Sequence, residues 1–206
     1  MLTKILGTAT QIVEGFGGLF GIRTTEEPLY VREAEIGAVE IRRYGPRIAA
    51  QTVVTGDENE ARNAGFRRIA GYIFGGNRRK TEISMTAPVA QQSEKIAMTA
   101  PVAQSSGAEG ESVIRFFMPS QWSMELLPEP DDKRVELVEV PGETYAVLRF
   151  SGDRSPATVA AKSDELLKAL QGTDFQPAGE PAAWFYDPPW TLPFRRRNEV
   201  AVPIKA

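Results

Sequence analysis

The chain has 206 residues, of which 42% are hydrophobic and 25% charged, and its formal net charge is −3. This composition is typical of a globular protein with a sizeable core. The net charge lacks the basic surplus of general nucleic-acid binders, so we expect no nucleic-acid partner. The chain has neither cysteine nor histidine. Disulfides, thiolate catalysis, a Ser-His-Asp triad and histidine-ligated metal sites are therefore excluded.

The N-terminal segment is a separate question. Residues 1–22 place apolar side chains at helical spacing and predict an amphipathic helix. Residues 24–28, TTEEP, read as a linker, so we predict a segment 1–27 ahead of a domain 28–206. The helix is too polar for a clear membrane span. It has three possible roles: docking on the domain, weak contact with a membrane surface, or a poor signal peptide. We expect a cytoplasmic protein, with a membrane-associated or exported one as the alternative.

Two internal repeats organise the rest of the chain. The short repeat is ISMTAPVAQ at 83–91 and IAMTAPVAQ at 96–104, and its period-two pattern predicts a pair of strands. The long repeat places VEIRRYGPRIAAQTVVTGD at 39–57 over VELVEVPGETYAVLRFSGD at 135–153. Each copy predicts two strands or one long bent strand, because turn residues interrupt it in the middle.

Each copy of the long repeat leads into a helix. Asp57 with Glu60 resembles a capping box at the start of the first helix, and Ser155 followed by Pro156 is a good start for the second. Strand-like runs follow the first helix at 82–90, 95–103 and 112–119, and the second at 182–187 and 198–204, with loops expected at 105–111 and 128–133. The order predicts an α+β protein of two pseudo-symmetric βαββ repeats, with a curved, barrel-like antiparallel sheet that carries two helices.

No catalytic constellation emerges from the sequence, so we expect neither an enzyme nor a metal site. The first helix mixes cationic side chains with an apolar face, and the residues concerned are Arg62, Arg67, Arg68, Phe66, Ile69, Tyr72 and Ile73. A cationic rim over an apolar floor suits a flat amphipathic ligand that carries carboxylates. A core helix with a solvated basic back explains the same pattern. The aromatic and proline-rich stretch 184–200 is either a ligand wall, a peptide-binding edge or a cap on the sheet.

These segments together resemble the SOUL haem-binding protein family. The resemblance is carried by KIAMTAPV at 95–102, its echo EISMTAPV at 82–89, YDPPWTLPFRRRNEV at 186–200, and the helix GFRRIAGYIFGGN at 65–77. It implies a distorted antiparallel β-barrel of the gyrase-inhibitor-like or effector-binding architecture. It also implies non-covalent binding of haem or another tetrapyrrole on the first helix, near the loop that joins the last strands. Carried over to this chain, the ligand-binding residues are Arg62, Gly65, Phe66, Ile69, Tyr72, Ile73, Trp190, Thr191 and Leu192.

The absence of histidine is a departure from family members that use one as an axial ligand. The chain then binds the ring by packing and carboxylate pairing, uses Tyr72, Met85 or Met98 as a ligand, or binds no haem. Our first hypothesis is a non-enzymatic carrier or buffer of haem or another tetrapyrrole. The alternative is a small-molecule sensor or protein-interaction module on the same scaffold. An enzyme acting on tetrapyrroles is a third reading, and the sequence leaves the oligomeric state open.

Overall fold

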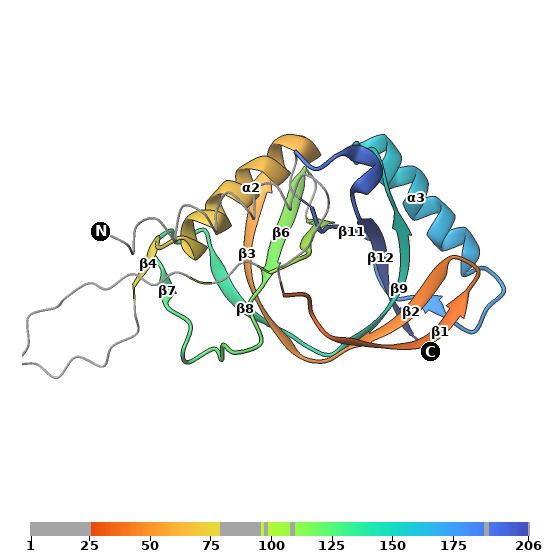
Figure 1. The fold of residues 1–206 in the computed structure, drawn as a ribbon, viewed down its shortest axis with the longest axis horizontal. Coiled ribbons are helices and arrows are strands. Elements are labelled where there is room, and N and C mark those ends of the chain that lie inside the picture. Colours follow the sequence, from red (N-terminus) through yellow and green to blue (C-terminus); the bar gives the residue numbers. More distant parts are fainter. Residues whose placement is uncertain (1–25, 79–95, 97–98, 108–109, 188–189, 206) are drawn as a thin grey trace, which may run out of the picture.

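A computed structural model of the chain describes residues 26–78, 96, 99–107, 110–187 and 190–205 (Figure 1). The predicted helix 1–22 and the first MTAPV copy lie outside these residues. The elements are β1 (Tyr30–Ile36), β2 (Val39–Tyr44), β3 (Arg47–Thr55), α2 (Glu58–Ile73), β4 (Asn77–Arg78), β5 (Val102–Ser106), β6 (Glu111–Phe117), β7 (Glu129–Pro130), β8 (Glu136–Val140), β9 (Glu143–Phe150), α3 (Pro156–Ala169), β10 (Gln176–Pro177), β11 (Ala182–Phe185), the 3-10 helix η1 (Pro193–Arg195) and β12 (Asn198–Lys205). None of the described helices is long and apolar enough to cross a membrane.

The main sheet is antiparallel and follows the order β1-β2-β9-β12-β11-β5-β6-β3-β8, with β10 paired to β12. From β2 to β8 this order is symmetric about the central pair of β11 and β5. The long sequence repeat explains the symmetry, because β2 and β3 form its first copy and β8 and β9 its second. The two copies pair crosswise, β2 with β9 and β3 with β8. The prediction of two related halves in one curled antiparallel sheet with two helices is confirmed.

Both helices begin where the sequence predicts. The Asp57 side chain accepts hydrogen bonds from the backbone N–H groups of Asn59 and Glu60 at the start of α2. The Ser155 side chain accepts one from the N–H of Thr158 at the start of α3. These caps satisfy helix N–H groups that have no partner within the helix. In Figure 1 the helices lie on the outside of the curled sheet, and α2 contacts β3 and β6 while α3 contacts β9 and β12.

Two strand predictions need correction. Of the strand expected at 95–103, residues 95, 97 and 98 lie outside the described residues. The described strand is Val102–Ser106, and it begins after Pro101, which has no N–H to give to a ladder. The loop expected at 105–111 is accordingly shorter, since β5 and β6 pair up to Ser106 and Ser112. The strand β1 has no counterpart in the sequence prediction. Its residues are mostly exposed, as on a sheet edge, so no alternation of apolar and polar residues reveals it.

The core has three parts. One buried cluster lies between α3 and the sheet and includes Leu166, Leu170 and Val200. A second lies between α2 and the sheet, around Ile69 and Phe116. The third occupies the opposite, inner face of the sheet, and its members are Tyr44, Ala49, Ala100, Ala103, Phe117, Val140, Val147, Trp184, Tyr186 and Ala201. Neighbouring strand residues alternate between the helix-covered and the inner clusters, as the pleat requires.

Candidate ligand-binding site

Four of the predicted α2 residues face the sheet. Ile69, Tyr72 and Ile73 are at most 2% exposed, and Gly65 is also buried. The Tyr72 hydroxyl donates a hydrogen bond of 3.0 Å to the carbonyl of Pro128. These residues attach α2 to the sheet, so a ligand on the outer surface does not touch them.

The other two predicted helix residues are accessible. The Arg62 guanidinium carbon lies 4.9 Å from the centre of the Phe185 ring. Phe66 is half-buried, with its ring centre 5.4 Å from that of Phe116. Of the two further arginines, Arg67 is exposed. Arg68 is engaged on the sheet, where it donates to the Thr52 hydroxyl at 2.6 Å. Arg62 is therefore the arginine of α2 that faces the chain's last strands.

The predicted loop residues have three different environments. Trp190 is 62% exposed and Leu192 is half-buried, whereas Thr191 is fully buried. The carbonyl of Thr191 accepts a hydrogen bond of 2.8 Å from the Arg196 side chain. The carbonyl of Pro193 accepts one of 2.9 Å from the N–H of Gly152. These contacts fix the loop beside the start of α3, with the Trp190 ring open to solvent.

A cleft lies between the starts of α2 and α3, with Arg62, Glu58 and Phe185 in its lining and Arg154 close to the Phe185 ring. Arg154 lies near the same ring, with 5.8 Å between its guanidinium carbon and the centre of the Phe185 ring. Burial, with the positive charges of Arg62 and Arg196, lowers the pKa of Arg154 to about 10. Burial also lowers the pKa of Arg62. Arg62 donates to the Asn59 side chain, and Arg154 donates to the Asp187 carbonyl at 3.3 Å. Glu58 and Asp153 near Arg62, and Asp187 near Arg154, offset part of the cost of burial, and a carboxylate ligand would offset more of it.

The cleft itself is small. It has a volume of about 60 Å³ and lies between Glu58 at the start of α2 and Val159 near the start of α3, above strands β5, β6 and β11. Figure 1 shows the first turns of the two helices converging at the top of the molecule. Helix N-termini carry partial positive charge, which adds to that of the arginines. The predicted site residues do not include Arg154 or Phe185, although Phe185 lies in the stretch 184–200 that the sequence analysis considers as a ligand wall. The one available signal for Arg154 was its place just before the helix start at Ser155.

A larger cavity lies at the other end of the sheet. It has a volume of about 700 Å³ and is lined by residues of the segments 26–29, 45–48, 117–122 and 139–141, together with Thr99. The β2–β3 and β8–β9 bends form one of its walls. None of the predicted site residues lines it, so this cavity was not expected from the sequence.

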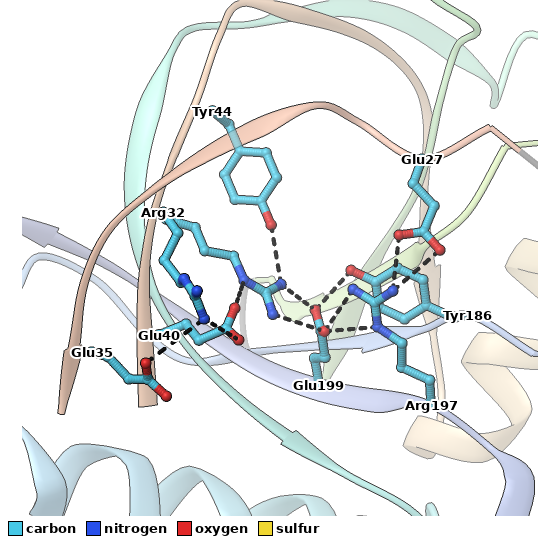
Figure 2. Close-up of polar contacts among 9 residues, drawn as sticks. Glu27, Arg32, Glu35, Glu40, Tyr44, Tyr186, Arg197 and Glu199 are labelled. Atoms are coloured by element: carbon cyan, nitrogen blue, oxygen red, sulfur yellow. Dashed lines mark hydrogen bonds and ion pairs between the residues drawn. The ribbon is translucent and has the colours of Figure 1, made fainter. Parts of the chain in front are cut away.

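A buried ionic cluster lies on the inner face of the sheet (Figure 2). The Glu199 carboxylate has no exposed surface. It accepts hydrogen bonds from Arg42 at 2.9 Å, from Arg197 at 2.9 Å and from the Tyr186 hydroxyl at 2.7 Å. Arg197 also pairs with Glu27 at 2.9 Å. The cluster therefore ties the segment ahead of β1 to β12, although the sequence placed Glu27 in the linker.

Of the three candidate axial ligands, Tyr72 is the one that lies among the described residues. Among them, no group of three acidic, histidine or cysteine side chains is placed to hold a metal ion. The Tyr72 hydroxyl is buried, donates to a carbonyl, and has a pKa raised by burial, so its phenolate form is disfavoured. Met85 and Met98 lie outside the described residues. The cationic cleft fits the propionate groups of a tetrapyrrole, but not its metal.

Comparison with known sequences decides the family. A sequence model of the SOUL heme-binding protein family matches residues 25–203. The chain belongs to this family. Heme-binding protein 2 of Mus musculus is 29% identical over 174 residues, which cover 80% of this chain and 77% of that protein. Heme-binding protein 2 of Homo sapiens is 32% identical over 137 residues, which cover 65% of this chain and 60% of that protein. Heme-binding protein 1 of Mus musculus is 27% identical over 159 residues, or 76% and 78%.

Solved structures agree with the fold of this SOUL family member. A hydrolase from Listeria innocua has a TM-score of 0.52 at 14% identity, covering 84% of this chain and 94% of that one. The C-terminal domain of EcmrR has a TM-score of 0.55 at 8% identity, covering 86% and 98%. At such low identities these likenesses show a shared α+β fold and nothing about activity.

Proposed function

We propose that this SOUL family member binds haem or another tetrapyrrole non-covalently, as a carrier or buffer and not as an enzyme. Family membership supports a tetrapyrrole ligand. The observation that carries the proposal is the pair Arg62 and Arg154, which share the Phe185 ring and whose cost of burial the nearby acidic residues offset only in part. Two cations over an aromatic floor suit the two carboxylates at the edge of a flat ring.

In the proposed binding mode, most of the ligand lies on the surface of the protein. A cleft of about 60 Å³ admits a carboxylate but not a macrocycle, so the ring lies across the outer surface. The surface members of the predicted site, Arg62, Phe66, Trp190 and Leu192, contact the ligand in this proposal. Gly65, Ile69, Tyr72, Ile73 and Thr191 support them from below. An exposed Trp ring beside a cationic cleft is a suitable wall for an aromatic ring system.

We propose that binding needs no axial ligand, and the buried Tyr72 hydroxyl, whose pKa burial raises, supports this. The affinity then comes from ring packing and from the carboxylates, which metal-free protoporphyrin shares with haemin. Arginines also stay protonated at neutral pH, which suits carboxylate binding and does not suit proton transfer. The cytoplasmic location and a membrane contact of residues 1–22 remain predictions.

The first test is titration of the purified protein with haemin and with protoporphyrin IX, followed by absorbance and tryptophan quenching. Arg62→Gln is expected to weaken binding of both ligands about tenfold, because it removes a charge-assisted hydrogen bond of about 1.5 kcal/mol. Arg67→Gln, which removes an exposed charge from the same helix, is the matched control and should leave both affinities unchanged.

Each alternative outcome has a clear reading. An equal loss of affinity in Arg62→Gln and Arg67→Gln would mean that ligand binding depends only on the overall charge. It would contradict binding at the cleft. Binding of haemin alone, with a shifted Soret band, would contradict binding without an axial ligand. Failure of both porphyrins to bind would contradict the tetrapyrrole proposal and favour a different ligand.

A further inference from the structure

The large cavity at the strand bends has the dimensions of a small-molecule site. Its volume of about 700 Å³ lies within the usual range of about 300 to 1,000 Å³ for ligand pockets. Apolar side chains such as Phe117, Met118 and Val140 contribute to its walls. A pocket of this kind favours an apolar ligand with few polar groups, each met by a specific partner on the protein.

Arg47 supplies a positive charge in this cavity, where burial lowers its pKa although Tyr145, Tyr44 and Glu143 offset part of that effect. Its side chain lies between two aromatic rings, with its guanidinium carbon 4.6 Å from the centre of Tyr44 and 4.5 Å from that of Phe117. Its Nε and Nη2 atoms are buried and have no hydrogen-bond partner. A buried donor without an acceptor destabilises a protein, and a charged one does so more. An acceptor that arrives with a ligand would satisfy the two donors once the flanking rings of Tyr44 and Phe117 make room for it.

A second unmatched donor lies in the same wall. The indole Nε1 of Trp122 is also buried without a partner, and Trp122 lines the cavity. Among the described residues only four buried side-chain atoms lack a partner, and three of them belong to these two residues. Their concentration in one cavity indicates a built site for an acceptor group.

The acidic residues that line the cavity do not make it a site for a cationic ligand. Glu27 is paired with Arg197 at 2.9 Å. Glu26 accepts a hydrogen bond of 2.8 Å from the backbone N–H of Ser120, and Glu139 is exposed at the surface. Each of these carboxylates is thus bonded or hydrated, while Nε and Nη2 of Arg47 are neither. The polar complement that the cavity lacks is an anion.

We propose that this cavity binds an apolar molecule that carries a carboxylate, with the acid on Arg47 and the apolar part against Phe117, Met118 and Trp122. The site goes beyond the tetrapyrrole proposal and does not depend on it. The two sites lie at opposite ends of strand β6, because Ser112 lines the cleft and Phe117 lines the cavity. Five residues of extended strand span about 17 Å. Figure 1 shows the bends at the opposite end of the sheet from the first turns of the helices.

The test uses cis-parinaric acid, a fluorescent fatty acid, and its methyl ester as a neutral counterpart. Parinarate fluorescence, and energy transfer from Trp122, report on occupancy of the cavity. The wild-type protein is expected to bind the acid at least about tenfold more tightly than the ester, since only the acid forms a charge-assisted hydrogen bond. Equal affinities for the two probes, or no binding of the acid, would overturn the proposal.

Variants assign the effect to Arg47. Arg47→Gln should weaken binding of the acid about tenfold and leave the ester unchanged, whereas Arg47→Lys should retain part of the preference for the acid. Arg67→Gln is the control for an equal change of net charge. Trp122→Phe should abolish most of the energy transfer. An unchanged acid affinity in Arg47→Gln would contradict the site even if the cavity were occupied.

Competition separates this proposal from the tetrapyrrole site. Haemin added to the parinarate complex is expected to leave the fatty acid bound, and Arg62→Gln should not change the parinarate affinity. Displacement of parinarate by haemin in the wild type, lost in Arg47→Gln, would place the tetrapyrrole in the cavity and overturn the second site. The fatty-acid measurements need no haemin, so the two proposals can fail separately.

Discussion

At the scale of single residues, Glu199 shows how a buried charge is made tolerable. Burial alone would raise the pKa of this carboxyl, but the hydrogen bond and charge of Arg42, with the charge of Arg197, lower it below its ordinary value of 4.5. Figure 2 shows Arg197, Tyr186 and Glu199 converging on the inner face of the sheet. Such an arrangement is stable only while each charge keeps its partner.

Replacement of Glu199 by glutamine should therefore be costly. Glu199→Gln leaves Arg42 and Arg197 as buried cations without their shared acid, and we expect the free energy of unfolding to fall by about 3 kcal/mol. Urea denaturation monitored by tryptophan fluorescence measures the loss. Glu180→Gln, at an exposed position, is the control and should change the free energy of unfolding by less than about 0.5 kcal/mol.

The same carboxyl predicts a dependence on pH. Because its pKa is lowered in the folded protein, the stabilisation is complete above the ordinary value of 4.5 and is lost as the pH falls through the folded value. The wild type should thus lose more stability than Glu199→Gln between pH 5 and acid conditions. Parallel pH profiles of the two proteins would show that Glu199 is not linked to folding in this way.

At the scale of elements, the contact of α2 with β6 depends on a glycine. A Cβ atom on Gly65 would lie 2.5 Å from Cγ1 of Ile114, which is far inside van der Waals contact. The glycine lets the helix approach the strand closely, and this explains its place in the sequence without a ligand. Gly71 of the same helix has no atom within 4 Å of an added Cβ.

The two glycines should respond to alanine in opposite directions. Gly65→Ala is expected to lower the free energy of unfolding by about 2 kcal/mol through overpacking against Ile114. Gly71→Ala should raise it by about 0.5 to 1 kcal/mol, because alanine is the better helix former in open space. Thermal and urea unfolding of both variants measure this. A Gly65→Ala protein of normal stability that has lost haemin binding would instead support direct contact of Gly65 with the ligand.

At the scale of the whole molecule, a nearly symmetric sheet carries the two proposed sites. The central pair of β5 and β11 lies under the cationic cleft, and the bends between β2 and β3 and between β8 and β9 form the cavity. The repeat does not extend to the functional side chains: Arg47 corresponds to Glu143 in the second copy. Because the backbone is nearly symmetric but the charged side chains are not, the two ends of the sheet are suited to ligands of different shape.

Separate sites predict additive stabilisation. At a free concentration of about 100 times its Kd, haemin or parinaric acid alone should raise the free energy of unfolding by about 2.7 kcal/mol, and both together by about 5.4 kcal/mol. A single shared site would limit the combined effect to about 3 kcal/mol. Urea denaturation with each ligand and with both distinguishes the two cases, with Arg47→Gln as the variant that should lose the fatty-acid contribution.

Much of the fold could be predicted because it depends on interactions between residues that are close in the sequence. Asp57 and Ser155 mark the helix starts because a capping side chain satisfies backbone groups only a few residues away. The repeat at 39–57 and 135–153 fixed the pairs of strands, since similar residues at similar spacing form the same bend twice. Edge strand β1 escaped prediction because exposure on both faces removes the periodic signal.

The candidate sites could be located only in the tertiary structure. An apolar stripe on α2 suits a sheet and a ligand equally well, and only packing showed that Ile69, Tyr72 and Ile73 face the sheet. Arg47 and Arg154 look like ordinary surface charges in the sequence, because their burial arises from segments far apart in the chain. The sequence by itself determined the family, the two halves and the helix starts, which rest on local patterns. The cationic cleft and the cavity at the bends were decided by three-dimensional contacts, because the electrostatics of a charge depends on what surrounds it.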